Sequence, residues 1–308
     1  MRNEDLKVLK KICRMNEETL HYFLCKKLKE YGYTCVDNQP MFIMAEGTSP
    51  ICLCAHMDTV FTQPPQDIFY DFQHKVMWSP QGLGADDRAG IFIILKVLQA
   101  GLRPSIIFTH GEERGGKGAD EIVKTYGDCP FLNCKALIQL DRQGGNDAVY
   151  YNCDNKAFEQ RIMSYGFKTE WGTFSDISVL GPIWEVAAVN LSVGYIREHS
   201  VAETLYTEFL LRTFYKVCDM IHDSETKWCN YSYIPAKTYP GYFSLLFSDS
   251  PTEEDSEFPL EDDDEGEDYF YNRCLFCNRL IKPNEQHYRQ DGFKICPECY
   301  NTYYGTTL

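Results

Sequence analysis

Short apolar runs alternate with amphipathic segments throughout residues 1–247, and this alternation restricts the fold more than any other feature of the chain. The apolar runs have the length of strands and lie at 50–58, 105–113, 135–141 and 185–194. The amphipathic segments have helical periodicity and lie at about 17–30, 89–100, 119–127, 155–166 and 201–222. Buried strands that alternate with helices are typical of a parallel sheet covered on both faces. The sequence therefore predicts an α/β fold with three α/β/α layers around a mostly parallel sheet.

Charge divides the 308-residue chain into three predicted parts. The net charge is −15, and the segment 249–268 alone holds twelve carboxylates with no Lys or Arg. Such a block cannot bury enough apolar surface to fold. We therefore expect a folded body at 1–247, an acidic flexible linker at 248–268 and a separate tail at 269–308.

Composition also limits which binding partners and which cellular compartment we expect for the protein. The chain lacks the broad basic surface that phosphate contacts require, which argues against nucleic acid as a partner. No run reaches the ~18 apolar residues of a membrane span, and the first residues lack the apolar core of a signal peptide. We expect a cytoplasmic protein without a membrane partner.

Four cysteines in the tail have the spacing of a metal site. Cys274 and Cys277 form one CxxC pair, and Cys296 and Cys299 form a second pair after eighteen residues. Four thiolates give the closed tetrahedral shell that structural Zn²⁺ prefers, and a segment of about 40 residues needs such support to fold. The tail resembles a zinc-ribbon or treble-clef module, with His287 as an alternative ligand. This module or the acidic linker is a candidate surface for a protein partner, and either could gate the body.

Polar residues able to bind metals follow the apolar runs of the body. In parallel sheets, sites form at the carboxyl ends of the strands. Such residues occur after all four runs and at the start of one helix. They are His56, Asp58, Asp86, Asp87, Glu112, Glu113, Asp141 and His199. So many groups at one edge of a sheet predict a metal centre rather than a solvated surface.

These residues suffice to hold two divalent ions. If Asp86 bridges the ions, His56 and Asp141 complete one ligand set, and Glu113 and His199 complete the other. Each set offers the nitrogen and oxygen ligands that Zn²⁺ accepts, with positions left for water and substrate. A hydroxide held between the ions would be the nucleophile, because metal coordination lowers the pKa of water to around 7.

Two further residues then have separate predicted tasks. Glu112 would be the general base that takes the proton of the water and passes it to the leaving amine. Asp58 would accept the second ring N–H of His56 and fix its tautomer.

The ordered segments AHMDTV, GADDRAG, THGEERGGKGAD, LDR and REHSVAE resemble the co-catalytic zinc aminopeptidase and tripeptidase superfamily, over about residues 1–225. The resemblance implies two active-site ions, either Zn²⁺ or Mn²⁺ or Co²⁺, with Glu112 as base and Asp58 as the orienting group. The ligands that it implies are His56, Asp86, Glu113, Asp141 and His199. The resemblance also implies that Asp87 supports the ligands without binding an ion itself. Relatives often insert a lid domain between the fourth and fifth ligands, whereas only 57 residues separate these two ligands here. The resemblance therefore implies a single-domain form that recognises a free peptide N-terminus.

The leading hypothesis is a two-metal aminopeptidase that acts on peptide substrates. An amidohydrolase acting on a non-peptide amide would use the same residues, and a catalytically idle interaction protein recruited through the zinc module is a third hypothesis. Asp176, in GTFSD, is a candidate to bind a substrate amine, and His110 is either near the site or structural. The other ten cysteines show no ligand spacing, and we expect most of them to be small buried apolar side chains.

Overall fold

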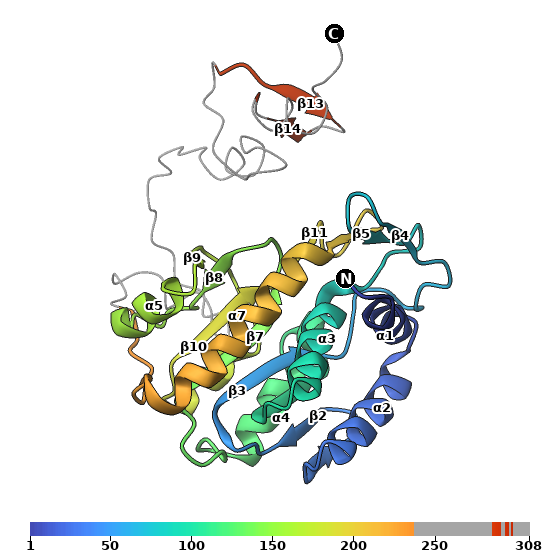
Figure 1. Ribbon diagram of the computed structural model, residues 1–308. Coiled ribbons are helices and arrows are strands. Elements are labelled where there is room, and N and C mark those ends of the chain that lie inside the picture. Colours follow the sequence, from blue (N-terminus) through green and yellow to red (C-terminus); the bar gives the residue numbers. More distant parts are fainter. Residues whose placement is uncertain (237–284, 291–292, 296, 298–308) are drawn as a thin grey trace, which may run out of the picture. The chain divides into compact units, whose positions relative to one another are not determined.

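The computed structural model describes residues 1–236, 285–290, 293–295 and 297. The chain divides into two compact units, Met1–Tyr242 and Phe243–Leu308. Figure 1 shows the elements of both units in the order of the chain.

The described part of the second unit is a short hairpin. Strands β13 (Tyr288–Gln290) and β14 (Phe293–Ile295) pair antiparallel. His287 precedes the hairpin, and its Nδ1 lies 2.9 Å from the backbone oxygen of Glu285. The acidic linker lies outside the described residues, as do Cys274, Cys277, Cys296 and Cys299. The zinc module and the limits of the three parts therefore stay predictions.

An eight-stranded sheet forms the centre of the first unit, in the order β1-β2-β6-β3-β7-β10-β8-β9. Its strands are β1 (Cys35–Asn38), β2 (Phe42–Ala45), β3 (Ser49–His56), β6 (Pro104–Thr109), β7 (Ala136–Arg142), β8 (Asp147–Val149), β9 (Lys168–Thr169) and β10 (Ala188–Ser192). The central strands β6, β3, β7 and β10 are parallel, whereas β1–β2, β2–β6 and β10–β8 are antiparallel pairs. The predicted α/β fold with a mostly parallel sheet is confirmed.

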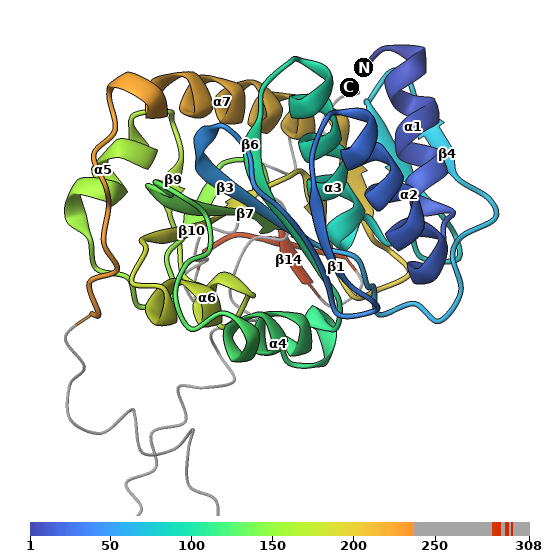
Figure 2. The same cartoon turned by 90° about the horizontal axis from the view of Figure 1, so that it is seen from below.

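Helices cover both faces of this sheet. They are α1 (Asn3–Cys13), α2 (Glu17–Glu30), α3 (Ala85–Gln99), α4 (Lys117–Thr125), α5 (Lys156–Met163), α6 (Ile177–Ile183) and α7 (Thr207–Thr226). Figure 2 shows α1, α2, α3 and α7 on one face and α4 and α6 on the other, which gives the predicted three layers. Within the described residues, no helix combines the length and the apolar character needed to cross a membrane.

Apolar side chains fill the space on each side of the sheet. One core cluster, which includes Ile93 and Val217, lies under α1, α2, α3 and α7. The other, which includes Ile122 and Leu180, lies under α4 and α6. Helix α3 packs on β3 and β7 and is itself covered by α1 and α7, so nearly all of its residues are buried. The segment 89–100, expected to be an amphipathic helix, is therefore buried on nearly every side instead of on one face.

A second, four-stranded sheet corrects one sequence-based expectation. Its order is β11-β12-β5-β4, and its strands are β4 (Phe69–Asp71), β5 (Val76–Trp78), β11 (Tyr195–Ile196) and β12 (Thr204–Tyr206). The helix predicted over 201–222 is wrong at its start, because β12 precedes α7. Leu205 of β12 pairs with Met77 of β5, and both are fully buried, so tertiary pairing outweighs the helical periodicity of this segment.

Candidate metal centre and active site

The register of the parallel strands brings three predicted site positions to one level. His56, the last residue of β3, pairs with Thr109, the last residue of β6. On the other side of β3, Cys54 pairs with Gln139 of β7, so Asp141 lies two residues further along, level with His56. The carboxyl ends of the central strands therefore form the floor of the candidate site.

Asp86, near the start of α3, places its side chain beside these strand ends. Its backbone and that of Asp87 are not helical, and the peptide bond between them is cis. Oδ1 of Asp86 lies 3.1 Å from Nε2 of His56, and Oδ2 lies 3.1 Å from Nε2 of His199. The two oxygens of one carboxylate thus face two different histidines.

The first cluster consists of His56, Asp86 and Asp141, whose ligand atoms all lie within 4.8 Å of one another. Nε2 of His56 is 3.3 Å from Oδ1 of Asp141. Burial opposes the charged imidazole, but the charge of Asp141 and hydrogen bonds to neighbouring carboxylates raise the pKa of His56 well above its usual value. Burial also raises the pKa of Asp141, to about 7, with a contribution from the charge of Asp86.

The second cluster consists of Asp86, Glu113 and His199, again with ligand atoms within 4.8 Å of one another. Nε2 of His199 lies 2.9 Å from Oε2 of Glu113. Hydrogen bonds to Asp86 and Glu113 raise the pKa of His199 to about 11. The His199 side chain is 53% exposed, so this cluster is the one open to solvent. Oε1 of Glu113 is buried and has no hydrogen-bond partner among the described residues.

Glu112 lies beside both clusters and belongs to neither. It begins the short 3₁₀ helix η1 (Glu112–Arg114), directly after β6 and a two-residue turn. Its Oε2 is 3.9 Å from Nε2 of His56, and its side chain is 13% exposed. Burial raises the pKa of Glu112 to about 9, and the negative charges of Asp141 and Asp176 act in the same direction.

Asp58 acts mainly on the loop that holds the two glutamates. Its Oδ1 accepts the backbone N–H of Gly111 at 2.8 Å and of Glu112 at 3.2 Å, and its Oδ2 accepts that of Glu113 at 3.3 Å. Nδ1 of His56 is 3.0 Å from the backbone oxygen of Asp58 and 3.5 Å from the carboxylate. The ring N–H therefore has its closest partner in the backbone of Asp58 rather than in the side chain. Despite the effect of burial, hydrogen bonds lower the pKa of Asp58.

The other residues singled out in the sequence lie around this centre. Asp87 is fully buried and accepts the backbone N–H of His56 at 3.3 Å. Asp176 is also fully buried and accepts a hydrogen bond from the hydroxyl of Thr109, while burial raises the pKa of Asp176 to about 6. Its contact with a substrate amine stays a prediction. Nδ1 of His110 is 3.3 Å from Oε2 of Glu17.

Sequence reasoning missed two residues that contact the predicted ligands. The hydroxyl of Tyr195 lies 3.2 Å from Oδ1 of Asp86 and 3.1 Å from Oδ1 of Asp141. Glu203 accepts the backbone N–H groups of Ala85 and Asp86 at 2.9 and 3.0 Å. Both residues are buried. Nothing in the local sequence indicates that Tyr195 lies at the site. Glu203 is the last residue of the segment REHSVAE, which also contains the predicted ligand His199.

The two clusters fit a pair of divalent cations. Four carboxylate side chains at this centre are at most 13% exposed, and only two histidines lie among them to offset their negative charge. The carboxylates are those of Asp86, Glu112, Glu113 and Asp141. Buried like charges repel strongly unless cations or protons neutralise them. Each cluster offers one imidazole and two carboxylates, a donor set that Zn²⁺, Mn²⁺ and Co²⁺ accept. The partnerless oxygen of Glu113 is a further atom available to a cation.

Comparison with known proteins shows the fold. No protein-family description and no curated protein matches the sequence. Among solved structures, aminopeptidase PepT from Bacillus cereus ATCC 10987 is 15% identical, with a TM-score of 0.58 over 72% of this chain and 98% of the other. A tripeptidase from Staphylococcus aureus is 14% identical, with a TM-score of 0.59 over 71% and 97%. The TET1 peptidase of Pyrococcus horikoshii is 14% identical, with a TM-score of 0.54 over 70% and 99%. The body of this chain has the fold of these peptidases.

Proposed function

We propose that the chain is a metal-dependent exopeptidase that uses two divalent cations and releases residues from the free N-terminus of peptides. The observation that carries the proposal is the position of Asp86, whose two oxygens lie 3.1 Å from His56 and 3.1 Å from His199. A single carboxylate that faces two ligand sets is the arrangement needed to bridge two ions. The fold shared with structures named aminopeptidase and tripeptidase also supports a peptide substrate.

Glu112 is the proton carrier of this proposal. Bound in the two clusters, the cations would polarise the peptide carbonyl and lower the pKa of a water molecule. Glu112 makes no close contact within either cluster, so its carboxylate is free to accept the proton of that water and return it to the leaving amine. Its pKa, raised to about 9 among these carboxylates, would be lowered by nearby cations, which brings it towards the neutral range that proton transfer in both directions requires.

Asp58 and Glu203 position the residues that act. The three N–H groups accepted by Asp58 fix the turn that aims Glu112 and Glu113. The two N–H groups accepted by Glu203 fix the start of α3 and hence Asp86. These contacts hold the base and the bridging carboxylate in place before a substrate binds.

The segment between the last two proposed ligands favours an aminopeptidase without a lid domain. Between Asp141 and His199 the chain forms β8, α5, β9, α6, β10 and β11. Three of these strands belong to the central sheet, so the segment completes the body and leaves no length for an inserted domain.

The test measures peptide cleavage with the full chain. Purified protein is incubated with Zn²⁺, Mn²⁺ or Co²⁺ and three forms of one peptide: free, N-terminally acetylated and C-terminally amidated. We expect release of the first residue from the free and amidated forms and none from the acetylated form. Release from none of the three peptide forms, with cleavage of an N-acetyl amino acid assayed beside them, would replace the proposal with an amidohydrolase.

Matched variants connect the activity to the site. Glu112→Gln should keep the metal content and lose activity by about 10²–10⁴-fold, the usual contribution of a general base. Glu225→Gln, an exposed position on α7, should behave like the unaltered protein. Full activity in Glu112→Gln would overturn the assignment of the base.

A further inference from the structure

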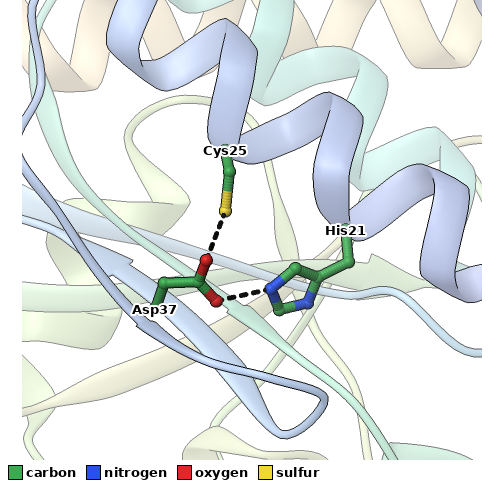
Figure 3. Close-up of side chains that lie close together, drawn as sticks. All are labelled: His21, Cys25 and Asp37. Atoms are coloured by element: carbon green, nitrogen blue, oxygen red, sulfur yellow. Dashed lines mark hydrogen bonds and ion pairs between the residues drawn. The ribbon is translucent and has the colours of Figure 1, made fainter.

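Three side chains of types that can bind a metal lie close together outside the candidate active site. His21 and Cys25 lie on α2, and Asp37 lies on β1, the edge strand of the sheet (Figure 3). We propose that these three side chains bind a zinc ion that joins α2 to β1. The proposal is independent of the peptidase function.

The geometry of the cluster is close to that of a zinc site. His21 and Cys25 are four residues apart on a helix, so both side chains lie on the face that meets β1. Nε2 of His21 is 2.7 Å from Oδ1 of Asp37, and Sγ of Cys25 is 3.4 Å from Oδ2 of the same carboxylate. The three ligand atoms all lie within 4.8 Å of one another, as do those of the two active-site clusters.

Only a small movement separates these distances from those of a bound ion. Ligand atoms held about 2.0–2.3 Å from a tetrahedral zinc ion lie roughly 3.3–3.7 Å apart. Sγ of Cys25 is 3.4 Å from Oδ2 of Asp37, which falls in this range, whereas Nε2 of His21 is 2.7 Å from the other oxygen, Oδ1, roughly half an ångström too short. A rotation of the carboxylate together with a shift of this size would let one oxygen serve as the ligand. The Asp37 side chain is 46% exposed on an edge strand, so it has room to move.

The chemistry of the donors favours zinc. A thiolate with an imidazole and a carboxylate suits Zn²⁺, whereas Mg²⁺ and Ca²⁺ prefer oxygen ligands alone. His21 and Cys25 are buried, at 5% and 7% exposure. Cys35 lies two residues before Asp37 on the same face of β1, and its charge contributes to raising the pKa of Cys25. Cys35 or a water molecule would occupy the fourth position.

The surroundings of the second ring nitrogen of His21 agree with a metal ligand. Nδ1 is buried and has no hydrogen-bond partner among the described residues. His21 lines a cavity of about 400 Å³ together with Glu17 and Glu18. A neutral imidazole that binds zinc through Nε2 carries its proton on Nδ1, and carboxylates or water in this cavity can accept it. A neutral imidazole that instead donates Nε2–H to Asp37 leaves Nδ1 as a buried acceptor without a partner among the described residues.

A nucleophilic role for Cys25 does not fit the arrangement. Asp37 lies between the thiol and the imidazole, so His21 is not placed to take the thiol proton. Burial, followed by the charge of Asp37, raises the pKa of Cys25 to about 12, which keeps the free thiol protonated. A bound zinc ion is the group that would convert it to a thiolate ligand.

The ion would steady the side of the body that adjoins the candidate active site. The first turn of α2 carries Glu17. Its Oε2 lies 3.3 Å from Nδ1 of His110, and its Oε1 lies 3.8 Å from Nη2 of Arg114. These two residues flank the pair Glu112-Glu113. A metal link between α2 and β1 therefore restrains a helix that contacts the loop of the proposed base.

Cobalt spectroscopy separates this site from the active-site clusters. Co²⁺ bound to thiolate shows near-ultraviolet charge-transfer absorption, and neither active-site cluster contains sulfur. The full chain loaded with Co²⁺ is compared with Cys25→Ser and with Cys218→Ser, a half-buried cysteine on α7 that serves as the matched control. We expect Cys25→Ser to lose part of this absorption and about one zinc ion per chain by mass spectrometry, and Cys218→Ser to lose neither.

A second variant guards against an effect of misfolding. Asp37→Asn alters a partly exposed side chain on the edge strand and should also lower the zinc content by about one ion, with an unchanged far-ultraviolet circular dichroism spectrum. Added zinc should raise the Tm of the unaltered chain more than that of either site variant. Zinc content and cobalt absorption in Cys25→Ser and Asp37→Asn equal to those of the unaltered chain would overturn the proposal. Peptide release plays no part in these readouts, so a failure of the proposed peptidase function would be seen separately.

Discussion

Glu203 holds Asp86 by its backbone: Oε1 of Glu203 accepts the N–H of Asp86 at 3.0 Å. Oε2 accepts the neighbouring N–H of Ala85 at 2.9 Å, and the glutamate is fully buried. These two bonds fix the chain where it enters α3. The carboxylate of Asp86 is thereby placed between His56 and His199.

Glu203→Gln should therefore weaken metal binding without changing a proposed ligand. The amide group of glutamine can present only one oxygen to the two N–H groups, so one of them loses its acceptor. We expect metal affinity to fall by about 10–100-fold, as for other residues that orient ligands. Glu208→Gln, on the exposed surface of α7, is the matched control. Titration of the metal-free proteins with Zn²⁺ measures the effect, and equal affinities in both variants would contradict it.

Tyr195→Phe tests the hydroxyl that lies between two proposed ligands. The hydroxyl is within 3.2 Å of both Asp86 and Asp141 and is their shared donor. Without it the two carboxylates lose a hydrogen bond that steadies their mutual orientation, and we expect affinity for the ion on the His56 side to fall about tenfold. Tyr215→Phe, at an exposed position, should leave affinity unchanged. A Tyr195→Phe protein with unaltered affinity and activity would show that the hydroxyl does not position the ligands.

The sequence predicts the residues that follow buried strands better than those that reach the site from elsewhere. His56 and Asp141 are accessible to prediction because a run of apolar residues indicates a strand, and parallel strands end at one edge. Tyr195 lies on the short strand β11 of the second sheet, far along the chain from Asp86. A two-residue strand has no periodicity to detect, and its contacts depend on the whole fold.

The cluster on α2 shows the same limit for cysteines. His21 and Cys25 have a helical spacing that is visible in the sequence, but the third member, Asp37, lies on a strand that forms only when β1 pairs with β2. Spacing within CxxC pairs is local and can be read directly, as in the tail. A site assembled from two elements requires the tertiary structure.

The bridging role proposed for Asp86 predicts how many metal ions each ligand variant loses. Asp86→Asn should remove about two ions per chain, because each cluster loses a ligand, whereas His199→Ala and Asp141→Asn should each remove about one. Mass spectrometry of the full chain measures the difference from the unaltered protein, in which any ions held elsewhere are common to all variants. If Asp86→Asn and His199→Ala lost the same number of ions, Asp86 would serve only one of them.

Asp141 gives the metal-free protein a predictable pH dependence. Burial, with the charge of Asp86, raises the pKa of Asp141 to about 7, whereas the unfolded chain has the ordinary value of about 4. Between these values the folded state keeps a proton that the unfolded state has lost, so the contribution of Asp141 to the free energy of unfolding falls as pH rises and levels off above about 7. We expect the Tm of the metal-free chain to decrease over this window, and to decrease less in Asp141→Asn, which has no such proton. Asp219→Asn, an exposed position on α7, should retain the full slope. Thermal unfolding in chelator at a series of pH values measures these slopes, and the same slope in Asp141→Asn as in the unaltered chain would mean that this carboxyl does not titrate in the window.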